Sequence, residues 1–491
     1  MKKIFLIIII FFITTNINYS QSVYVENAFN FSKNEYGGTA RFIGMGGAFG
    51  AIGGDFSSIA INPAGLGIYR SSEIVFSPGL NYNTNDATYL GSSINEGDYT
   101  LNMNNVGLVA SYELDDSDTR WVYVNFGVGF NRTVDLNNNV QFEGINNNSI
   151  MEVFVDYANN NASDPMDLDG LYEFLLFSSG VIDTSGGVFY SDITDAVIND
   201  PDNFEVFQRK IIETEGSISE FNFSFSGNYA NKLYVGASIG LFRVRYEQFA
   251  SHYEYETANV PFVFTDGFDF REYSTTEGGG YNFKIGAIYK PLEFLKVGAA
   301  VHTPTFYNLK QEFYNRAVGY YDTPNDYQPA TSPIQTYEYD LTSPWRYIGS
   351  VGFQIGKIAL IDVDYEYADY STMKLDDEFN SQEVSDDNDN IESMYDNTYN
   401  IRAGAEIRYG PLYFRGGGRY STSPYKNNSD YDKITFAGGL GYREKKFFID
   451  MAFSQLQYSY NMQAYEYEYN DAIANIDNKV NNYVLTLGFK F

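Results

Sequence analysis

The sequence predicts an all-β protein, a fourteen-stranded antiparallel transmembrane β-barrel with an N-terminal plug (hatch) inside the lumen. Three observations predict this fold. From residue 73 onward, apolar and polar residues alternate with period two, as expected for strands with one face toward lipid. The connections between these segments alternate between short and long. Aromatic residues make up 18% of the chain, which suits the aromatic girdles at the edges of a membrane-spanning band.

The first twenty residues predict a secretory signal peptide with cleavage after Ser20. Lys2 and Lys3 precede an apolar run at 4–13, and polar residues follow up to Ser20. The run is shorter than the roughly 20 residues that a membrane-spanning helix needs. No later stretch approaches 18 uncharged apolar residues, so no transmembrane helix is expected.

The barrel is assigned to residues 73–491. Strands are predicted at 73–83, 101–114, 120–138, 217–229, 232–256, 268–290, 294–316, 334–355, 358–374, 397–408, 412–421, 432–443, 447–468 and 480–491. Tight turns at 114–120, 230–231, 291–293, 356–357, 409–411 and 444–446 alternate with longer connections. Short periplasmic turns and longer outer loops are typical of bacterial barrels, which have an even number of strands.

Two stretches fall outside the alternating pattern. Residues 21–72 are Gly-rich but carry interleaved apolar residues such as Phe42, Met45 and Phe49, which predicts a packed hatch and argues against a flexible linker. Residues 139–216 predict a partly helical extracellular insertion, with short helices at 149–158, 167–177 and 203–214 from their apolar spacing.

Composition excludes several functions. The net charge is −31, with 63 acidic and 32 basic residues, which argues against nucleic-acid binding and suits solvated outer loops. With no cysteine, the chain has neither disulfides nor thiolate metal sites. The acidic runs at 166–170 and 386–390 do not match a calcium-binding loop, and the second is predicted to be a solvated loop. No metal or cofactor is expected.

The segment 236–240 reads Gly-Ala-Ser-Ile-Gly and matches the nucleophile elbow of hydrolases as text. It lies inside an alternating strand with no helix after it, and only His252 and His302 are present as candidate bases. We therefore expect that the protein is not an enzyme.

Charged residues on the inward faces of the predicted strands are candidate ligand-binding residues. They are Asp362, Asp364, Glu366, Arg402, Arg415 and Arg419, with Lys284 and His302 as further candidates. The favoured interpretation is a network of ion pairs that supports the barrel. The alternative is that one cation remains free to bind a substrate carboxylate.

The segment 37–69 resembles the hatch of the FadL/TodX family of outer-membrane transporters of hydrophobic substrates. The resemblance rests on the Gly-rich run at 44–50, on Gly53-Gly54-Asp55, and on the hatch motif Asn62-Pro63-Ala64-Gly65. Segments 299–304, 343–346 and 364–367 are also similar to the family, so the resemblance spans the mature chain. It implies fourteen strands and a hatch that closes the barrel from the periplasmic side.

The resemblance also implies a function, namely passive transport of hydrophobic small molecules, most plausibly long-chain fatty acids, with lateral release through the barrel wall. Gly127 and Gly129 are candidates for a strand kink beside that opening, because glycine within a strand often marks a bend. Equally, these glycines make room for the hatch.

Two other functions remain open. The barrel is alternatively an interaction or shuttle partner of a secretion or surface-assembly system, or a haem-related or general porin. The expected partners are a hydrophobic small molecule, outer-membrane lipid, and the barrel-assembly machinery through the C-terminal strand that ends at Phe491. A monomer in the bacterial outer membrane is expected.

Overall fold

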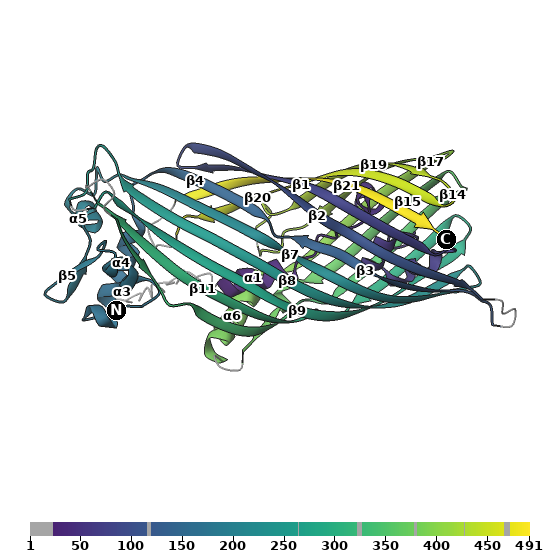
Figure 1. The fold of residues 1–491 in the computed structure, drawn as a ribbon, viewed down its shortest axis with the longest axis horizontal. Coiled ribbons are helices and arrows are strands. Elements are labelled where there is room, and N and C mark those ends of the chain that lie inside the picture. The colour runs from purple at the N-terminus through teal and green to yellow at the C-terminus, as the bar shows by residue number, and fades with distance from the viewer. Residues whose placement is uncertain are drawn as a thin grey trace, which may run out of the picture.

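The computed structural model describes residues 23–491 apart from 115–118, 264, 322–326, 378–380, 427 and 466–471. The predicted signal peptide at 1–20 lies outside these residues. In the described part, fourteen antiparallel strands close into a barrel, because the first, Glu73–Tyr89 (β1), pairs with the last, Ile473–Lys490 (β21). The predicted fold class is thus confirmed. Figure 1 shows the barrel from the side, with the C-terminus toward one end and a helical insertion at the other.

The barrel strands follow one another around the wall in chain order. Besides β1 and β21, eight described strands are uninterrupted: Ser92–Glu113 (β2), Val206–Tyr229 (β7), Leu233–Glu256 (β8), Gly267–Leu292 (β9), Asn397–Tyr409 (β17), Leu412–Ser421 (β18), Lys433–Arg443 (β19) and Phe447–Gln463 (β20). Four consist of two segments each: Trp121–Asp135 and Asn138–Asn146 (β3, β4), Leu295–His302 and Phe306–Tyr320 (β10, β11), Gln335–Thr342 and Arg346–Ile355 (β13, β14), and Ala359–Asp369 and Lys374–Asp376 (β15, β16). A short strand, Tyr327–Thr331 (β12), folds back onto β11.

The strands are longer at the outer end than the sequence pattern predicted. β1 and β2 continue through the predicted loop at 84–100 and turn at Leu90–Gly91, where both residues have positive φ. β7 and β8 have 24 residues each and β9 has 26. A transmembrane strand needs only about 9–11 residues, so the barrel extends well beyond the membrane.

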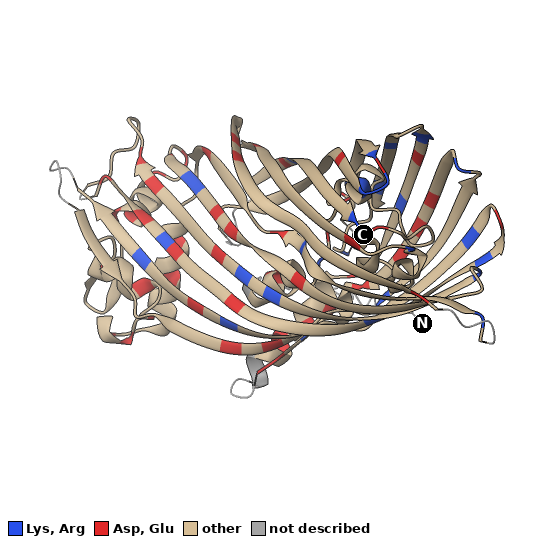
Figure 2. Ribbon diagram, turned by 45° about the vertical axis from the view of Figure 1, so that its right-hand side comes forward, with Lys and Arg blue, Asp and Glu red and all other residues tan. Residues whose placement is uncertain are grey.

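The outer surface of the barrel carries a band of exposed apolar side chains. Ile285 on β9 is 61% exposed, and Phe223 on β7, Phe283 on β9 and Phe436 on β19 are similarly uncovered. A closed barrel satisfies all its backbone groups internally and presents an apolar band to lipid. The protein is therefore a multi-pass β-barrel of the bacterial outer membrane. In Figure 2, acidic residues are scattered over the insertion and the outer parts of the strands.

Among the described residues, no helix is both long and apolar enough to cross a bilayer.

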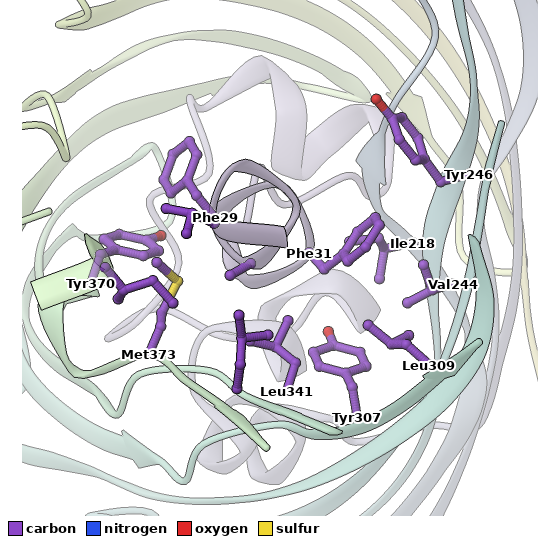
Figure 3. Packing of buried hydrophobic residues seen from close by; sticks show 14 of the residues in the cluster. Phe29, Phe31, Ile218, Val244, Tyr246, Tyr307, Leu309, Leu341, Tyr370 and Met373 are labelled. Atoms are coloured by element: carbon purple, nitrogen blue, oxygen red, sulfur yellow. The ribbon is translucent and has the colours of Figure 1, made fainter. Parts of the chain in front are cut away.

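The N-terminal segment lies against the inner face of the barrel. It contains Val23–Ser32 (α1), Ala40–Gly44 (α2), Phe56–Ala60 (η1) and Pro63–Ile68 (η2). Phe29 and Phe31 of α1 are buried by inward-facing apolar residues of the wall, such as Val244 and Leu309. Figure 3 shows this arrangement, with α1 surrounded by residues of several strands. Interior packing therefore holds the helix within the lumen.

The insertion between β4 and β7 is partly helical and has its own apolar core, which includes Phe189 and Ile193. It contains Ile150–Asn161 (α3), Pro165–Asp167 (η3), Glu173–Ser178 (α4), Asp183–Ser185 (β5), Val188–Tyr190 (β6) and Asp192–Asn199 (α5). The helix predicted at 203–214 is wrong, because this segment opens β7 and pairs with β4. The loop predicted around 386–390 is also wrong: it lies within the helix Ser381–Met394 (α6), which follows the short helix Tyr370–Thr372 (η4).

Candidate functional site

Both polar atoms of the Asn62 side chain in the hatch motif make hydrogen bonds. Its Oδ1 accepts from the backbone N–H of Ala64, which caps the start of η2, where Pro63 takes the first helical position. Its Nδ2 donates to Gly50 O at 2.8 Å and to Ala287 O at 3.3 Å. The motif thus ties two parts of the hatch to each other and to strand β9.

Glycines in the wall allow this close approach. A Cβ at Gly286 would stand 2.0 Å from Asn62 Oδ1, and one at Gly236 would stand 2.4 Å from Pro63 O. A side chain at either position would push the hatch away from the wall. Gly236, the first residue of the segment that matched a nucleophile elbow as text, therefore allows the hatch to pack closely against the wall. Ser238, the serine of that segment, is buried and donates to Asn222 Oδ1.

The three carboxylates of β15 point inward and contact the hatch. Asp364 accepts from the backbone N–H groups of Phe49 and Gly50, and Asp362 accepts from that of Ala51. Backbone N–H groups are good partners for a buried carboxylate, because charge-assisted hydrogen bonds offset part of its desolvation. These two residues hold the glycine-rich turn of the hatch.

Glu366 is the centre of a buried ion-pair cluster. Its carboxylate lies 3.1 Å from Arg346 Nη1 and 2.6 Å from Arg402 Nη2, and it accepts a hydrogen bond of 2.8 Å from Tyr36 Oη. Arg402 in turn lies over the Tyr36 ring, with 4.9 Å from Cζ to the centroid. Arg346 and Tyr36 were not identified from the sequence, because nothing in their spacing marks them as neighbours of Glu366.

A second cluster joins the hatch to strands β17, β18 and β20. Arg415 Nε and Arg41 Nε each lie 2.8 Å from Glu406 Oε2, and Arg415 Nη1 lies 2.8 Å from Asp450 Oδ1. Arg419 Nη1 donates to the backbone carbonyl of Glu35 at 2.9 Å. These contacts favour the interpretation of the inward-facing charges as a network of ion pairs.

The remaining two candidates also have partners. Lys284 Nζ lies 2.6 Å from Glu220 Oε1, with both side chains buried. His302 Nε2 donates to the carbonyl of Ile61 at 3.0 Å, just before the Asn62 motif. Neither is a free cation facing the lumen. In the described residues, no group of three His, Asp or Glu side chains has a metal-binding arrangement.

Gly127 and Gly129 do not mark a kink. Gly127 pairs with Val109 on β2 and with Ser224 on β7 without any register shift, and Gly129 is paired in the same way. A Cβ at Gly129 would stand 2.4 Å from Phe56 Cζ of the hatch. These glycines therefore make room for the hatch. The register shifts of β3 lie elsewhere, at Trp121/Tyr123 and, further along, at Arg132/Val134.

Beyond the irregularity at Arg132/Val134, β2 is no longer paired with the β3–β4 strand. We call this gap in the backbone pairing of the barrel wall the seam. The pairing of β2 with β3 ends at Asn105 and Asn131, and in the described strands residues 92–104 of β2 pair only with β1. β4 pairs with β7 on its other side. Two exposed side chains stand along the unpaired stretch of β2, Tyr99 at 65% and Leu101 at 82%. The seam therefore lies open to the outside of the barrel.

Beside this seam, asparagine side chains of β1 reach the β3–β4 strand where β2 has no backbone ladder with it. Asn83 Nδ2 donates to Asn137 O at 3.1 Å and to Asn138 Oδ1 at 2.9 Å. Asn85 Nδ2 donates to Asn139 O at 2.7 Å. A single such bond contributes about 0.5–1.5 kcal/mol. The seam can thus separate without disrupting a β-ladder.

Three cavities lie between the hatch and the outer mouth. The central cavity, of about 1020 Å³, lies beside α1 and is lined by Phe29, Lys33, Thr100, Asn138 and Tyr458, among others. A lower cavity of about 110 Å³ lies against the hatch. An outer cavity of about 350 Å³ lies between α1, α6 and β9, β11 and β13.

Neighbouring cavities share lining residues, and the central cavity reaches the seam. Gln248 and Glu272 line both the outer and the central cavities. Asn81 and Asp135 line both the central and the lower cavities. Thr100, on the unpaired stretch of β2, lines the central cavity. The cavities thus lie next to one another along the lumen, from the outer mouth to the seam.

Two charged groups of the hatch segment border the central cavity. Burial lowers the pKa of Lys33 from about 10.5 to about 8, against the opposing effect of Glu35. Burial alone would raise the pKa of Glu35, but Lys433, Lys33 and Arg419 together hold this pKa at about 2. The Lys433 Nζ lies 3.2 Å from Glu35 Oε1. Glu35 is therefore ionised across the physiological range.

Comparison with known proteins identifies the fold. No family model matches the chain, and no curated protein matches it in sequence. Among solved structures, a FadL homologue of Pseudomonas aeruginosa matches 93% of this chain and 99% of its own, with a TM-score of 0.55 and 14% identity. The toluene transporter TodX of P. putida matches 93% and 98%, with a TM-score of 0.54 and 14% identity. The fold that the sequence resemblance implied is thereby confirmed.

Proposed function

We propose that this barrel passively transports small molecules with a large apolar part across the outer membrane. A molecule enters at the outer cavity, passes through the central cavity and leaves sideways through the seam between β2 and the β3–β4 strand. The observation that carries this proposal is that Thr100, on the unpaired stretch of β2, lines the central cavity. Long-chain fatty acids are the ligand implied by the sequence resemblance, and toluene is transported by one of the structural neighbours.

The hatch supports a sideways exit over a straight one. Its buried hydrogen bonds and ion pairs, from Arg41 to Glu406 and from Asn62 to Gly50 and Ala287, hold it to the wall below the central cavity. Displacing it would leave several charged groups without partners, which is costly in a buried setting. The asparagine bridges of the seam are fewer and include a single carboxylate, that of Asp135, so the seam is the weaker barrier.

Lateral release also suits an apolar solute. Each buried CH₂ favours an apolar environment over water by about 0.8 kcal/mol. A path that ends in the membrane avoids the aqueous periplasm, whereas a water-filled pore would require full hydration of the solute.

The test is uptake of labelled oleate and labelled toluene by cells that lack their own importers, with and without this protein. Thr100→Trp places a bulky ring where the central cavity meets the seam, and we expect it to reduce uptake of both by about tenfold while the barrel still folds. Thr88→Trp is the matched control, because Thr88 is exposed on the same hairpin away from the cavities. Equal uptake by both variants would place the exit elsewhere, and no uptake by the unmodified barrel would refute the proposed function.

A further inference from the structure

The outer cavity has a chemical character that the proposed function does not explain. Aromatic rings form its walls. Tyr24 of α1 packs edge-on against Tyr337 and Tyr339, with centroid distances of 6.2 and 5.4 Å. Phe313 stacks on Tyr337 at 5.7 Å, with the two rings 9° from parallel. Ring faces carry partial negative charge, so an aromatic box of this kind attracts a cation.

All charged side chains in the described lining of the outer cavity are acidic. Its described lining contains three carboxylates, from Glu272, Asp377 and Asp387, and no Lys, Arg or His. Lys210 Nζ approaches Glu272 from the central cavity at 3.9 Å and offsets one of these charges. A lining whose charged residues are all acidic disfavours a carboxylate ligand and favours a cation.

Two buried polar atoms in the same lining lack a partner. Gln311 is 3% exposed and Tyr339 is 6% exposed. In the described part of the chain, Gln311 Oε1 and Tyr339 Oη make no hydrogen bond. A buried acceptor without a donor costs about 1–3 kcal/mol, and a ligand that supplies N–H donors would recover this. Both oxygens can accept.

The approach to the cavity has the same electrostatic character. The outer cavity includes Tyr172 of the insertion, and residues 147–205 of that insertion contain twelve Asp or Glu and no Lys or Arg. A single-signed field at a binding site raises the local concentration of the opposite charge and the association rate. Organic cations are therefore concentrated where the cavity opens.

We infer that the outer cavity binds an organic ammonium cation with an aromatic or aliphatic body. Its N–H groups donate to Gln311 Oε1 and Tyr339 Oη, its charge faces the three carboxylates, and its apolar body lies against the rings of Tyr24, Phe313 and Tyr337. This inference deepens the proposed function by naming a ligand class. It rests on that proposal only for the transport that follows binding.

Equilibrium binding to the purified full-length barrel in a non-ionic detergent tests the inference. The probes are 4-phenylbutylammonium, 4-phenylbutanol and 4-phenylbutanoate, which share one apolar body and differ in charge. We expect the ammonium to bind about tenfold more tightly than the alcohol, and the carboxylate to bind most weakly. Equal affinities, or tightest binding of the carboxylate, would overturn the inference.

Matched variants separate the cavity from the general negative charge of the protein. Glu272→Gln and Tyr339→Phe should each weaken ammonium binding about threefold to tenfold. Glu312→Gln and Tyr314→Phe change the same groups on β11 outside the cavity and should leave binding unchanged. Equal loss in all four variants would show that the cation binds through diffuse charge, against the inference.

The binding experiment tests the cation site and the uptake experiment tests the transport proposal, so the failure of one can be told from the failure of the other. Ammonium binding with no uptake of any labelled solute would sustain the site and refute the transport proposal. Uptake of oleate or toluene without preference for the ammonium probe would sustain transport and refute the cationic site.

Discussion

Arg41 of the hatch and Glu406 of the barrel wall form a bidentate ion pair across 365 residues of sequence. Arg41 Nε and Nη2 donate to Glu406 Oε2 and Oε1 at 2.8 and 3.1 Å, and Arg41 Nη1 donates to Gly54 O at 2.9 Å. Fork-to-fork geometry of this kind is strong and specific in direction. The pair thus fixes both the position and the rotation of the hatch.

Arg41→Met should loosen the hatch without unfolding the barrel. Removing one partner of a buried pair typically costs roughly 3 kcal/mol, although Arg415 still contacts Glu406 and limits the loss. We expect a measurable rise in ion conductance through single barrels in planar bilayers. Arg408→Met, at an exposed position on β17, the strand that carries Glu406, is the control and should conduct like the unmodified protein.

Gly107→Ala should destabilise the folded barrel, because a Cβ there would stand 2.4 Å from Cγ of the Phe56 ring. We expect a loss of about 1–3 kcal/mol, as for other overpacked cores. The readout is the temperature at which the folded band disappears in semi-native gel electrophoresis. Gly416→Ala has open space around its Cβ and should have no effect.

The same clash gives a double-mutant test. Adding Phe56→Ala to Gly107→Ala removes the ring that obstructs the new methyl group. The combined loss should be smaller than the sum of the two single losses. Strict additivity would show that the ring and the glycine do not interact.

Asn62→Asp should damage the hatch more than Asn62→Ala. Aspartate keeps the cap on Ala64 but loses the donors to Gly50 O and Ala287 O, and places a buried negative charge beside these carbonyls. Alanine loses these donors and also the cap on Ala64, but it places no charge in the buried site, and the buried charge is the larger cost. Protection of amides 40–68 from hydrogen exchange should fall in that order, and protection in Asn62→Asp equal to that of the unmodified protein would contradict this account.

Acidification should loosen the hatch between about pH 4.5 and pH 2. The folded-state pKa of Glu35 is about 2, below its usual value near 4.5. A lowered acidic pKa stabilises the folded state above the unfolded pKa, and this stabilisation is lost as pH falls through the window between the two values. Conductance at pH 3 should exceed that at pH 6, and Glu35→Gln should reduce this difference.

Replacing Asn83 and Asn85 by alanine should weaken the seam. Their amides make the contacts with residues 137–139 that bridge β1 and β4. We expect faster release of a loaded solute into lipid, by about tenfold or more for the loss of at least three hydrogen bonds. Asn95→Ala, which removes an exposed amide on the same hairpin, should leave release unchanged.

The sequence predicts the barrel well wherever one face of a strand meets lipid. Residues 361–367 alternate strictly, and Asp362, Asp364 and Glu366 point inward as expected. The pattern weakens outside the membrane, where the outward face meets water. That is why Val206–Tyr229 was taken for a helix at its start, since Ile211 and Ile212 are apolar neighbours and break the alternation.

The contacts of the hatch could not be predicted from the sequence. The hatch motif was visible as a Gly-rich segment with Asn62 and Pro63, but its partners depend on strand register and on the order of strands around the wall. The pairs from Arg41 to Glu406 and from Tyr36 to Glu366 join distant parts of the chain. The seam was equally hidden, because it follows from a pairing that β2 lacks rather than from any residue type.

The length of β7, β8 and β9 determines where the protein first meets its surroundings. At about 3.4 Å per residue, the 26 residues of β9 extend roughly 90 Å, against an apolar band about 25 Å tall. With the usual strand tilt of about 40°, this wall is roughly 70 Å tall, so it rises well above a bilayer of about 40–45 Å including headgroups. The mouth therefore opens some distance from the lipid surface, and solutes enter the lumen directly from the aqueous phase. Shortening these strands would bring the mouth closer to the membrane without altering the lumen below it.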